Sequence, residues 1–363
     1  MRITLAIPRR PTRPMQLGAL AIGGGAPISV QTMTKTDTRD VRATVAQILE
    51  LETAGCDIVR LAVVDEAAAK ALAEIRRAVH IPLIADIHFQ HTLALMAIDA
   101  GVDGLRINPG NIGGADRVRE VVLAAAPRRL PIRIGVNAGS LERDILKQHG
   151  SATAAALVES ALRHVRLLED AGHPWIKISV KASDVTRTVE AYRLLSKATD
   201  YPLHLGVTEA GTLLTGTVRS SVAMGILLAE GIGDTLRVSL TDHPVQEVRV
   251  GLELLRCFGM RPPGPSVISC PTCGRIQIDV ISLATLVETE LERYYRANPA
   301  APRPTVAVMG CVVNGPGEAR EADIAVAGGQ GKGAIYLKGA FVATVPENEI
   351  VERLMDQVRS WHG

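Results

Sequence analysis

The sequence predicts an α/β protein in which a (β/α)8 barrel of the TIM type is followed by a smaller C-terminal domain. Short apolar segments alternate eight times with amphipathic, Ala- and Leu-rich segments over about 250 residues. A stretch rich in proline and glycine then precedes a C-terminal part that carries two cysteine motifs. We therefore expect a barrel at residues 1–258, a linker at 259–265 and a second domain at 266–363.

The expected strands are short apolar runs, as is typical of buried parallel strands. The segments between them space their apolar residues as amphipathic helices do, for example at 44–54, 66–78 and 153–171. A doubly wound sheet would show the same alternation, but eight repeats without a dinucleotide-binding fingerprint favour the barrel. The eight expected strands are residues 27–33, 57–63, 82–88, 104–108, 131–137, 175–181, 202–208 and 235–240.

Composition excludes several classes of function. The net charge is only +2 and aromatic residues make up 3% of the chain, so we expect no nucleic acid partner. The most apolar run, residues 222–229, is too short to span a membrane, and no membrane partner is expected. Five cysteines and an N-terminus without a signal-peptide pattern indicate a reducing compartment, the cytoplasm.

Polar side chains recur on one face of most expected strands when these are read with a period of two. The interior of a barrel normally holds Val, Ile and Leu, and buried Lys or Arg is rare unless it is paired. Basic residues on several strands therefore predict an anionic ligand, because guanidinium groups bind phosphate oxygens in pairs and lysine adds charge. Outward-facing side chains paired with helix carboxylates are the alternative. The polar residues are Asp86, His88, Arg106, Asn108, Arg133, Asn137, Lys177, Ser179, Lys181, His204, Thr208, Arg237 and Ser239, with Arg60 and Glu209 near the ends of two strands.

Three cysteines lie in two turn-rich motifs: Cys270 and Cys273 in the first, Cys311 in the second, with Glu318 seven residues after Cys311. A zinc ribbon normally has a second close pair, although three thiolates and a carboxylate could still hold zinc. A thioredoxin-like redox motif would begin a βαβ pattern that is missing here. Three thiolates and an exchangeable oxygen ligand suit a [4Fe–4S] cluster with one labile iron. The other two cysteines, at 56 and 257, are expected to be structural.

Six motifs together resemble the 4-hydroxy-3-methylbut-2-enyl diphosphate synthase family, iron–sulfur enzymes of the non-mevalonate isoprenoid pathway. The similarity covers nearly the whole chain, and the two cysteine motifs are the most specific. Thr32 and Lys35 depart from the family pattern, in which Ser and Asn would be expected. The motifs are CPTCGR at 270–275, MGCVVNGPGEA at 309–319, ADIHF at 85–89, RINPGNIG at 106–113, IGVNAGS at 134–140 and GVTEAG at 206–211.

The resemblance implies the activity of an oxidoreductase that acts on CH or CH2 groups. Its substrate would be 2-C-methyl-D-erythritol 2,4-cyclodiphosphate, which is opened and loses a hydroxyl group as two electrons are consumed. The electrons would come from flavodoxin or ferredoxin through a [4Fe–4S] cluster. The resemblance further implies a head-to-tail homodimer and an α+β cluster domain that is similar to the cluster domain of sulfite and nitrite reductases.

The same resemblance assigns roles to individual residues. Cys270, Cys273, Cys311 and Glu318 would hold the cluster, and Glu318 would leave so that substrate reaches the unique iron. Glu209 is the expected catalytic carboxylate, with His88 and Asp86 as second choices for proton transfer. The expected diphosphate-binding residues are Arg60, Arg106, Asn108, Arg133, Asn137, Lys181, His204, Arg237 and Ser239.

Two alternatives belong to other functional classes. The first is a cluster-free transferase that resembles dihydropteroate synthase, whose barrel also binds diphosphate esters. The second is a non-catalytic iron–sulfur sensor, which would need a DNA-binding or partner module. The cysteine motifs argue against the first alternative, and the basic strand ends stay unexplained in the second.

Overall fold

The structure is a computed structural model that describes residues 7–108, 112–262, 264–311, 317 and 321–362. The chain divides into two compact units, residues 1–261 and 262–363. None of the described helices is both long enough and apolar enough to cross a membrane.

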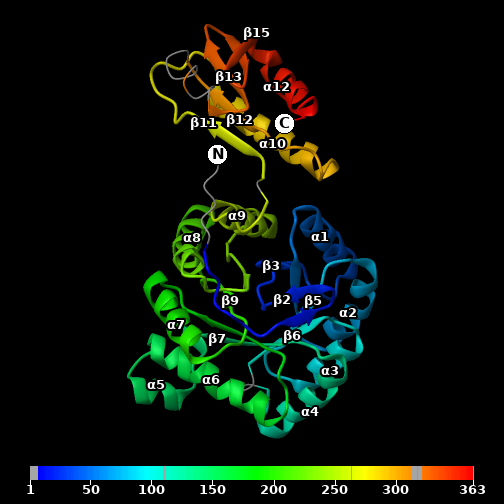
Figure 1. Ribbon diagram of the computed structural model, residues 1–363. Helices are drawn as coiled ribbons and strands as arrows, with labels where there is room; N and C mark the ends of the chain where they lie inside the picture. Colours follow the sequence, from blue (N-terminus) through cyan, green and yellow to red (C-terminus); the bar gives the residue numbers. More distant parts are fainter. Residues whose placement is uncertain (1–6, 109–111, 263, 312–316, 318–320, 363) are drawn as a thin grey trace. The chain divides into compact units, whose positions relative to one another are not determined.

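The N-terminal unit is a barrel of parallel strands surrounded by helices (Figure 1). Its strands are β3 (Ser29–Met33), β4 (Ile58–Ala62), β5 (Leu83–Asp86), β6 (Gly104–Ile107), β7 (Ile132–Asn137), β8 (Ile176–Lys181), β9 (His204–Leu205) and β10 (Thr235–Leu236). They pair in the order β8-β7-β6-β5-β4-β3-β10-β9. A bridge between Ile178 and Leu203 joins β8 to the β9 edge, so the eight-stranded sheet is nearly closed. The predicted TIM barrel is confirmed.

Helices connect each strand to the next. They are α1 (Val41–Thr53), α2 (Glu66–Ala78), α3 (His91–Asp99), α4 (Ala115–Ala125), α5 (Arg143–His149), α6 (Ala154–Asp170), α7 (Val185–Ala198), α8 (Leu213–Ala229) and α9 (Pro244–Cys257), with short 3₁₀ turns at Ala126–Arg128 and Ala138–Ser140. Side chains of Asp40, Asp65, Thr153 and Asp184 accept a backbone N–H at the start of α1, α2, α6 and α7. These caps satisfy N–H groups that have no partner within the helix.

The last two strands are shorter than expected. The sequence predicts strands at 202–208 and 235–240, whereas β9 and β10 have two residues each. The backbone of Arg237 still donates to the carbonyl of Leu205 at 3.0 Å. Beyond the expected end of the strand at residue 208, the chain turns, with φ of +52° at Glu209 and +119° at Gly211.

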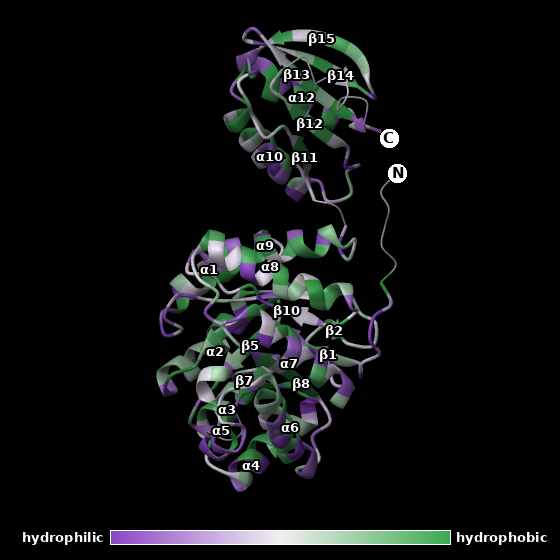
Figure 2. Cartoon of the chain, turned by 90° about the vertical axis from the view of Figure 1, so that its left-hand side faces the viewer, coloured by the Kyte–Doolittle hydropathy of each residue, from purple (hydrophilic) through white to green (hydrophobic). Residues whose placement is uncertain are grey.

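Alternation along the strands separates the core from the barrel interior. On β4, Val59 and Leu61 are fully buried in one apolar cluster with residues of the surrounding helices, such as Leu51 and Leu72. Arg60, between them, points to the opposite side of the sheet. Figure 2 shows hydrophobic and hydrophilic residues alternating along the surrounding helices. The helices therefore cover an apolar outer face of the sheet, and the interior is left to polar side chains.

A hairpin closes the end of the barrel at which the strands begin. Strands β1 (Met15–Leu17) and β2 (Leu20–Ile22) pair in antiparallel fashion. Leu17 and Ile22 form a separate apolar cluster with Ile58 and Ile84, which lie at the starts of β4 and β5. Since this end is filled by apolar side chains, a ligand would enter at the opposite end, where the strands finish.

The C-terminal unit is a mixed sheet with helices packed against it. Its strands are β11 (Ser266–Ser269), β12 (Thr305–Met309), β13 (Ile324–Gly329), β14 (Lys332–Leu337) and β15 (Ala340–Pro346). The helices described in this unit are α10 (Val280–Ala297) and α12 (Ile350–Arg359), with a 3₁₀ turn at Glu347–Glu349. The first three strands are parallel, and β14 and β15 are antiparallel to their neighbours. Leu283 and Leu354 share a core with Val306 and Val326. The similarity of this unit to the cluster domain of sulfite and nitrite reductases stays a prediction.

Candidate functional site in the barrel and at the cysteines

Charged side chains form a layer across neighbouring strands inside the barrel. Asp86 pairs in register with Arg106, Arg106 with Arg133, and Arg133 with Lys177. Residues paired in this way point to the same side of a parallel sheet, so all four side chains enter the interior. Each is at most 7% exposed. The expectation that these polar residues share one face of the strands therefore agrees with the strand register.

Asp86, the last residue of β5, holds two arginines and a histidine together. Its carboxylate lies 3.3 Å from Nε of Arg60, 3.2 Å from Nη1 of Arg106 and 3.5 Å from Nε2 of His88. Burial alone would raise the pKa of Asp86, but the charges of Arg60 and Arg106 and the contact with His88 hold it well below its usual range. Asp86 is therefore ionised throughout the working pH range and keeps both guanidinium groups in place.

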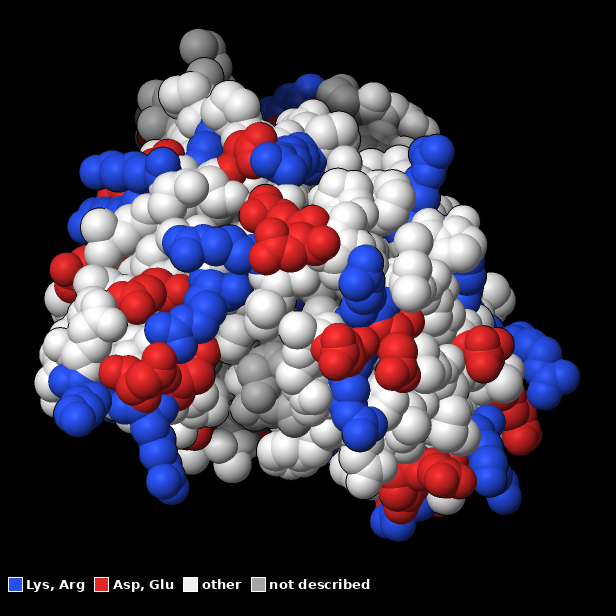
Figure 3. Space-filling model, turned by 90° about the horizontal axis from the view of Figure 1, so that it is seen from below, with Lys and Arg blue, Asp and Glu red and all other residues white. Residues whose placement is uncertain are grey.

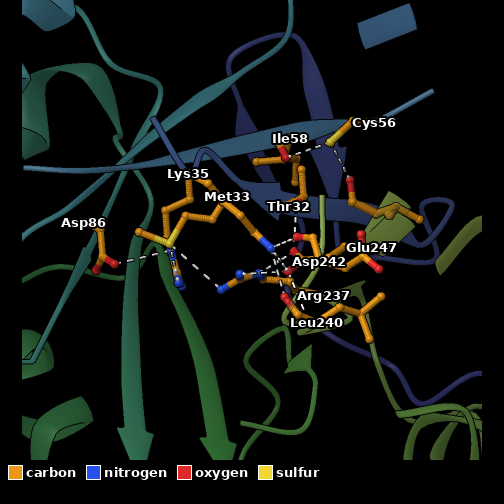
Figure 4. A network of polar contacts seen from close by, with 12 residues as sticks. Thr32, Met33, Lys35, Cys56, Ile58, Asp86, Arg237, Leu240, Asp242 and Glu247 are labelled. Carbon is orange, nitrogen blue, oxygen red and sulfur yellow. Dashed lines mark hydrogen bonds and ion pairs between the residues drawn. The ribbon is translucent and has the colours of Figure 1, made fainter. Parts of the chain in front are cut away.

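Glu247, in the first turn of α9, forms a second anionic centre, which the sequence reading missed. Its Oε2 accepts from Oγ1 of Thr32 at 2.6 Å and from Nε of Arg237 at 3.1 Å. Its Oε1 accepts from Nη2 of Arg237 at 3.3 Å and from the backbone of Leu240 at 3.1 Å. Figure 4 shows Arg237 between Glu247 and Met33. An acidic residue in a first helical turn is ordinarily interpreted as a partner of the helix dipole, so spacing alone gave no signal.

Among the described residues, no carboxylate forms an ion pair with Arg133, Lys177 or Lys181, in contrast to Arg60, Arg106 and Arg237. Nε and Nη1 of Arg133 and Nζ of Lys177 are buried and have no hydrogen-bond partner among the described residues. Burial lowers the pKa of Lys177 to about 7, and the charge of Arg133 adds to this. Burial and the arginines nearby, Arg133 first, also lower the pKa of Lys181 well below its usual value. Unpaired buried cations are costly, so this interior favours an anion.

His204 lies in the same interior as a neutral ring. It is fully buried, and its Nδ1 is 2.8 Å from Oγ1 of Thr235. Burial and then the charges of Arg133 and Lys181 lower its pKa well below the usual range. Its Nε2 has no partner among the described residues. A neutral imidazole in this position can donate or accept one hydrogen bond to a ligand.

Two inward-facing glycines, also missed from the sequence, make room for the cations. A Cβ at Gly135 would lie 2.7 Å from Nε of Arg106. A Cβ at Gly206 would lie 2.6 Å from Nζ of Lys181. Both distances are shorter than a Cβ can adopt without displacing its neighbour. A glycine in the middle of a strand was the available signal, because it often marks the close approach of another group.

The remaining predicted residues lie at or near the ends of the strands. Asn108 is buried and Asn137 and Ser239 are partly exposed. Glu209 is exposed and adopts φ of +52°, and the side chain of His88 is 50% exposed. Glu209 is therefore free to contact a ligand from the open end, whereas Asp86 is enclosed by the arginines.

The interior carries more positive than negative charge. The cations are Arg60, Arg106, Arg133, Lys177, Lys181 and Arg237. Among the described residues, the carboxylates in ion-pair contact with them are Asp86 and Glu247. In contrast, Figure 3 shows Lys and Arg side chains interspersed with Asp and Glu on the outer face it displays. The site is therefore suited to a small anion with several negative charges, such as a diphosphate.

The three motif cysteines border one cavity in the C-terminal unit. Cys270, Cys273 and Cys311 line a cavity of about 110 Å³, together with Arg275, Ile276 and Met309. Cys270 and Cys311 are half-buried and Cys273 is exposed. The backbone of Gly310 donates to Sγ of Cys270 at 3.4 Å, a contact that stabilises a thiolate. Glu318 lies outside the described residues.

Three thiolates around one cavity are a donor set that fits an iron–sulfur cluster. Within the described part of the chain, no three His, Cys, Asp or Glu side chains lie close enough to hold one ion. Cysteines that hold a cluster bind different irons, so they lie farther apart around a shared cavity.

The two cysteines outside these motifs have different surroundings. Burial raises the pKa of the Cys56 thiol to about 12, which makes it unreactive. Cys257, expected to be a buried structural residue, is exposed at the end of α9.

Comparisons with known proteins cover both units. Residues 12–252 match the family described as GcpE TIM-barrel domain, and residues 266–360 match the GcpE protein C-terminal domain. A relative from Geobacter sulfurreducens is 57% identical over 96% of this chain and 97% of its own length. Relatives from Desulfotalea psychrophila and Thermodesulfovibrio yellowstonii are 56% and 55% identical, each over 97% of this chain and at least 96% of their own lengths. All three are named 4-hydroxy-3-methylbut-2-en-1-yl diphosphate synthase (flavodoxin).

Proposed function

Because the chain belongs to the GcpE family of 4-hydroxy-3-methylbut-2-en-1-yl diphosphate synthases, we propose that it makes this allylic diphosphate from 2-C-methyl-D-erythritol 2,4-cyclodiphosphate. The names of the relatives support the product and a flavodoxin donor. The observation that carries the proposal is the excess of buried cations inside the barrel, combined with three cysteines that line one cavity. The transferase and sensor alternatives have no comparable support.

The proposed reaction balances as a two-electron reduction. A carbon–oxygen bond from the ring to phosphate breaks, the hydroxyl group on the neighbouring carbon leaves as water, and a double bond forms between these two carbons. Counting both diphosphates as free acids, the conversion consumes two electrons and two protons. The linear product gains a phosphate oxygen with negative charge, and the barrel cations would stabilise that charge as it develops.

The barrel residues would bind and orient the diphosphate. Arg60 and Arg106, held by Asp86, would present fixed donors to phosphate oxygens. Lys181 and Arg133 would add positive charge, and neutral His204 a hydrogen bond. We assign Asp86 a positioning role, because a carboxylate with so low a pKa cannot donate a proton. Exposed Glu209 stays the proposed catalytic carboxylate, with His88 as second choice, and the full set adds Asn108, Asn137, Arg237 and Ser239.

Cys270, Cys273 and Cys311 would hold a [4Fe–4S] cluster, with Glu318 as the exchangeable fourth ligand. When bound, such a cluster transfers electrons and offers one iron to a substrate oxygen or carbon. We further propose a head-to-tail homodimer in the cytoplasm, with residues 259–265 as a hinge that lets the cluster domain approach a barrel. Electrons would come from flavodoxin, as the relatives' names indicate, with ferredoxin as the alternative donor.

The experiment is an anaerobic assay of the reconstituted protein with the cyclic diphosphate and reduced flavodoxin. We expect the linear diphosphate to form, and we expect Cys273→Ser to abolish turnover and lower the iron and sulfide content. Glu253→Gln, an exposed change on α9, is the control and should behave like the wild type. Full turnover by a colourless, iron-free protein would refute the proposal and favour the transferase alternative.

A further inference from the structure

We infer that Glu247 is a positioning residue of the diphosphate site: it fixes the guanidinium of Arg237 so that Nη1 is presented to the barrel interior. This role rests on the proposed function, since it assumes that Arg237 binds the diphosphate. Glu247 comes from α9, outside the strands that carry the other charged residues, and none of the family motifs identified in the sequence includes it.

The contacts divide the guanidinium of Arg237 between two partners. Nε and Nη2 both donate to the carboxylate of Glu247, at 3.1 and 3.3 Å. Among the described contacts, Nη1 meets only the sulfur of Met33, at 3.9 Å. The same sulfur accepts from Nη2 of Arg60 at 3.0 Å, so the two arginines face one another across Met33. A two-point contact fixes the plane of a guanidinium, which a single contact does not.

Glu247 is itself held from several sides. Its side chain is fully buried, and Thr32 on β3 and the backbone of Leu240 each donate to one oxygen. Nζ of Lys35 lies 3.8 Å from Oε1 and also donates to the carbonyls of Leu240 and Asp242. These contacts join β3, the segment after β10 and the start of α9 at one carboxylate (Figure 4). Arg237 therefore has one well-defined position before a ligand arrives, which reduces the cost of ordering it on binding.

A purely structural role would also explain a buried ion pair, so the test must separate the two. A buried carboxylate that serves only the fold would lower stability when replaced, without specific coupling to ligand affinity. A positioning residue should be coupled to Arg237 in ligand binding, because each variant would remove the same oriented donor. A double-mutant cycle on affinity measures this coupling directly.

The experiment measures the binding of inorganic pyrophosphate to the full-length, cluster-reconstituted protein by anaerobic calorimetry. We expect Glu247→Gln to raise Kd about tenfold, Arg237→Gln to raise it by a similar factor, and the double variant to differ by less than about twofold from Arg237→Gln alone. Glu253→Gln on the same helix is the matched control and should leave Kd unchanged. In turnover, the loss should appear in KM rather than in kcat.

Glu247→Asp provides a second variant if Glu247→Gln does not fold. It keeps the negative charge but is too short for the two-point contact, so Kd should still rise. The positioning role would be overturned if the double variant raised Kd by the product of the two single-variant factors. It would also be overturned if Kd were unchanged in folded Glu247→Gln and Glu247→Asp. A wild-type protein that binds no pyrophosphate would instead overturn the proposed diphosphate site, and the role of Glu247 with it.

Discussion

The buried side chain of Lys177 makes the stability of the barrel depend on pH. Burial and the charge of Arg133 lower its pKa to about 7, whereas the unfolded chain has the ordinary value of 10.5. The unfolded state therefore binds the proton more tightly. The resulting destabilisation is fully present below about pH 7 and decreases as pH rises towards the unfolded value. An anion bound beside Arg133 would raise the pKa again.

We predict that Lys177→Met stabilises the ligand-free protein at pH 6.5 by on the order of a few kcal/mol, and by much less near pH 9.5. Urea unfolding of the barrel at the two pH values measures the difference. Lys197→Met, at an exposed lysine on α7, is the control and should change little. A gain of equal size at both pH values would show that packing, rather than the buried charge, is responsible.

Glycines on the barrel strands leave space that allows the buried cations to lie close together. Gly135 on β7 leaves room for Arg106, and its carbonyl accepts from Nη2 of Arg106 at 3.2 Å. We predict that Gly135→Ala displaces Arg106 from Asp86 and weakens pyrophosphate binding about tenfold, with a loss of stability of about 1–3 kcal/mol. Gly139, which has open space around its Cβ position, is the control. If both alanine variants bind equally well, Arg106 does not need this space.

The hairpin β1–β2 allows a test of how the closed end of the barrel contributes to stability. Leu17 is 1% exposed and packs on Ile58 and Ile84, where the barrel is closed. We predict that Leu17→Ala lowers the free energy of unfolding of the barrel by about 2–4 kcal/mol, because it leaves a cavity. Pyrophosphate affinity should be preserved, since the ligand enters at the other end. A large loss of pyrophosphate affinity at unchanged stability would contradict the separation between the closed end of the barrel and the ligand-binding end.

Most of the architecture follows from local sequence patterns. The alternation of apolar runs and amphipathic segments predicted all eight barrel strands, and the period of two predicted that Arg106 and Arg133 point inward. Glu247 could not be found in this way, because it lies on a helix and contacts β3 only through tertiary packing. Strand propensity also did not reveal that β9 and β10 have only two residues each. The role of Asp86 as a countercharge required the distances to both arginines.

For the whole molecule, the proposed chemistry joins two units that each carry half of it. The barrel holds the cations and the C-terminal unit the cysteines. We propose that residues 259–265 act as a hinge between the two units. We predict that the cyclic diphosphate slows the loss of iron on exposure to air, because the closed form would exclude oxygen and water. Iron loss can be followed by absorbance. The same rate with and without the diphosphate would argue against closure.

Anaerobic electron paramagnetic resonance of the reduced, reconstituted protein, with and without 2-C-methyl-D-erythritol 2,4-cyclodiphosphate, tests the proposed function most directly. We expect a [4Fe–4S] signal that changes when the cyclic diphosphate is added, because a substrate that reaches the cluster would alter the surroundings of its iron. We also expect Glu318→Ala to alter the signal before the substrate is added. A protein without a cluster, or one that holds zinc at Cys270, Cys273 and Cys311, would refute the proposed function.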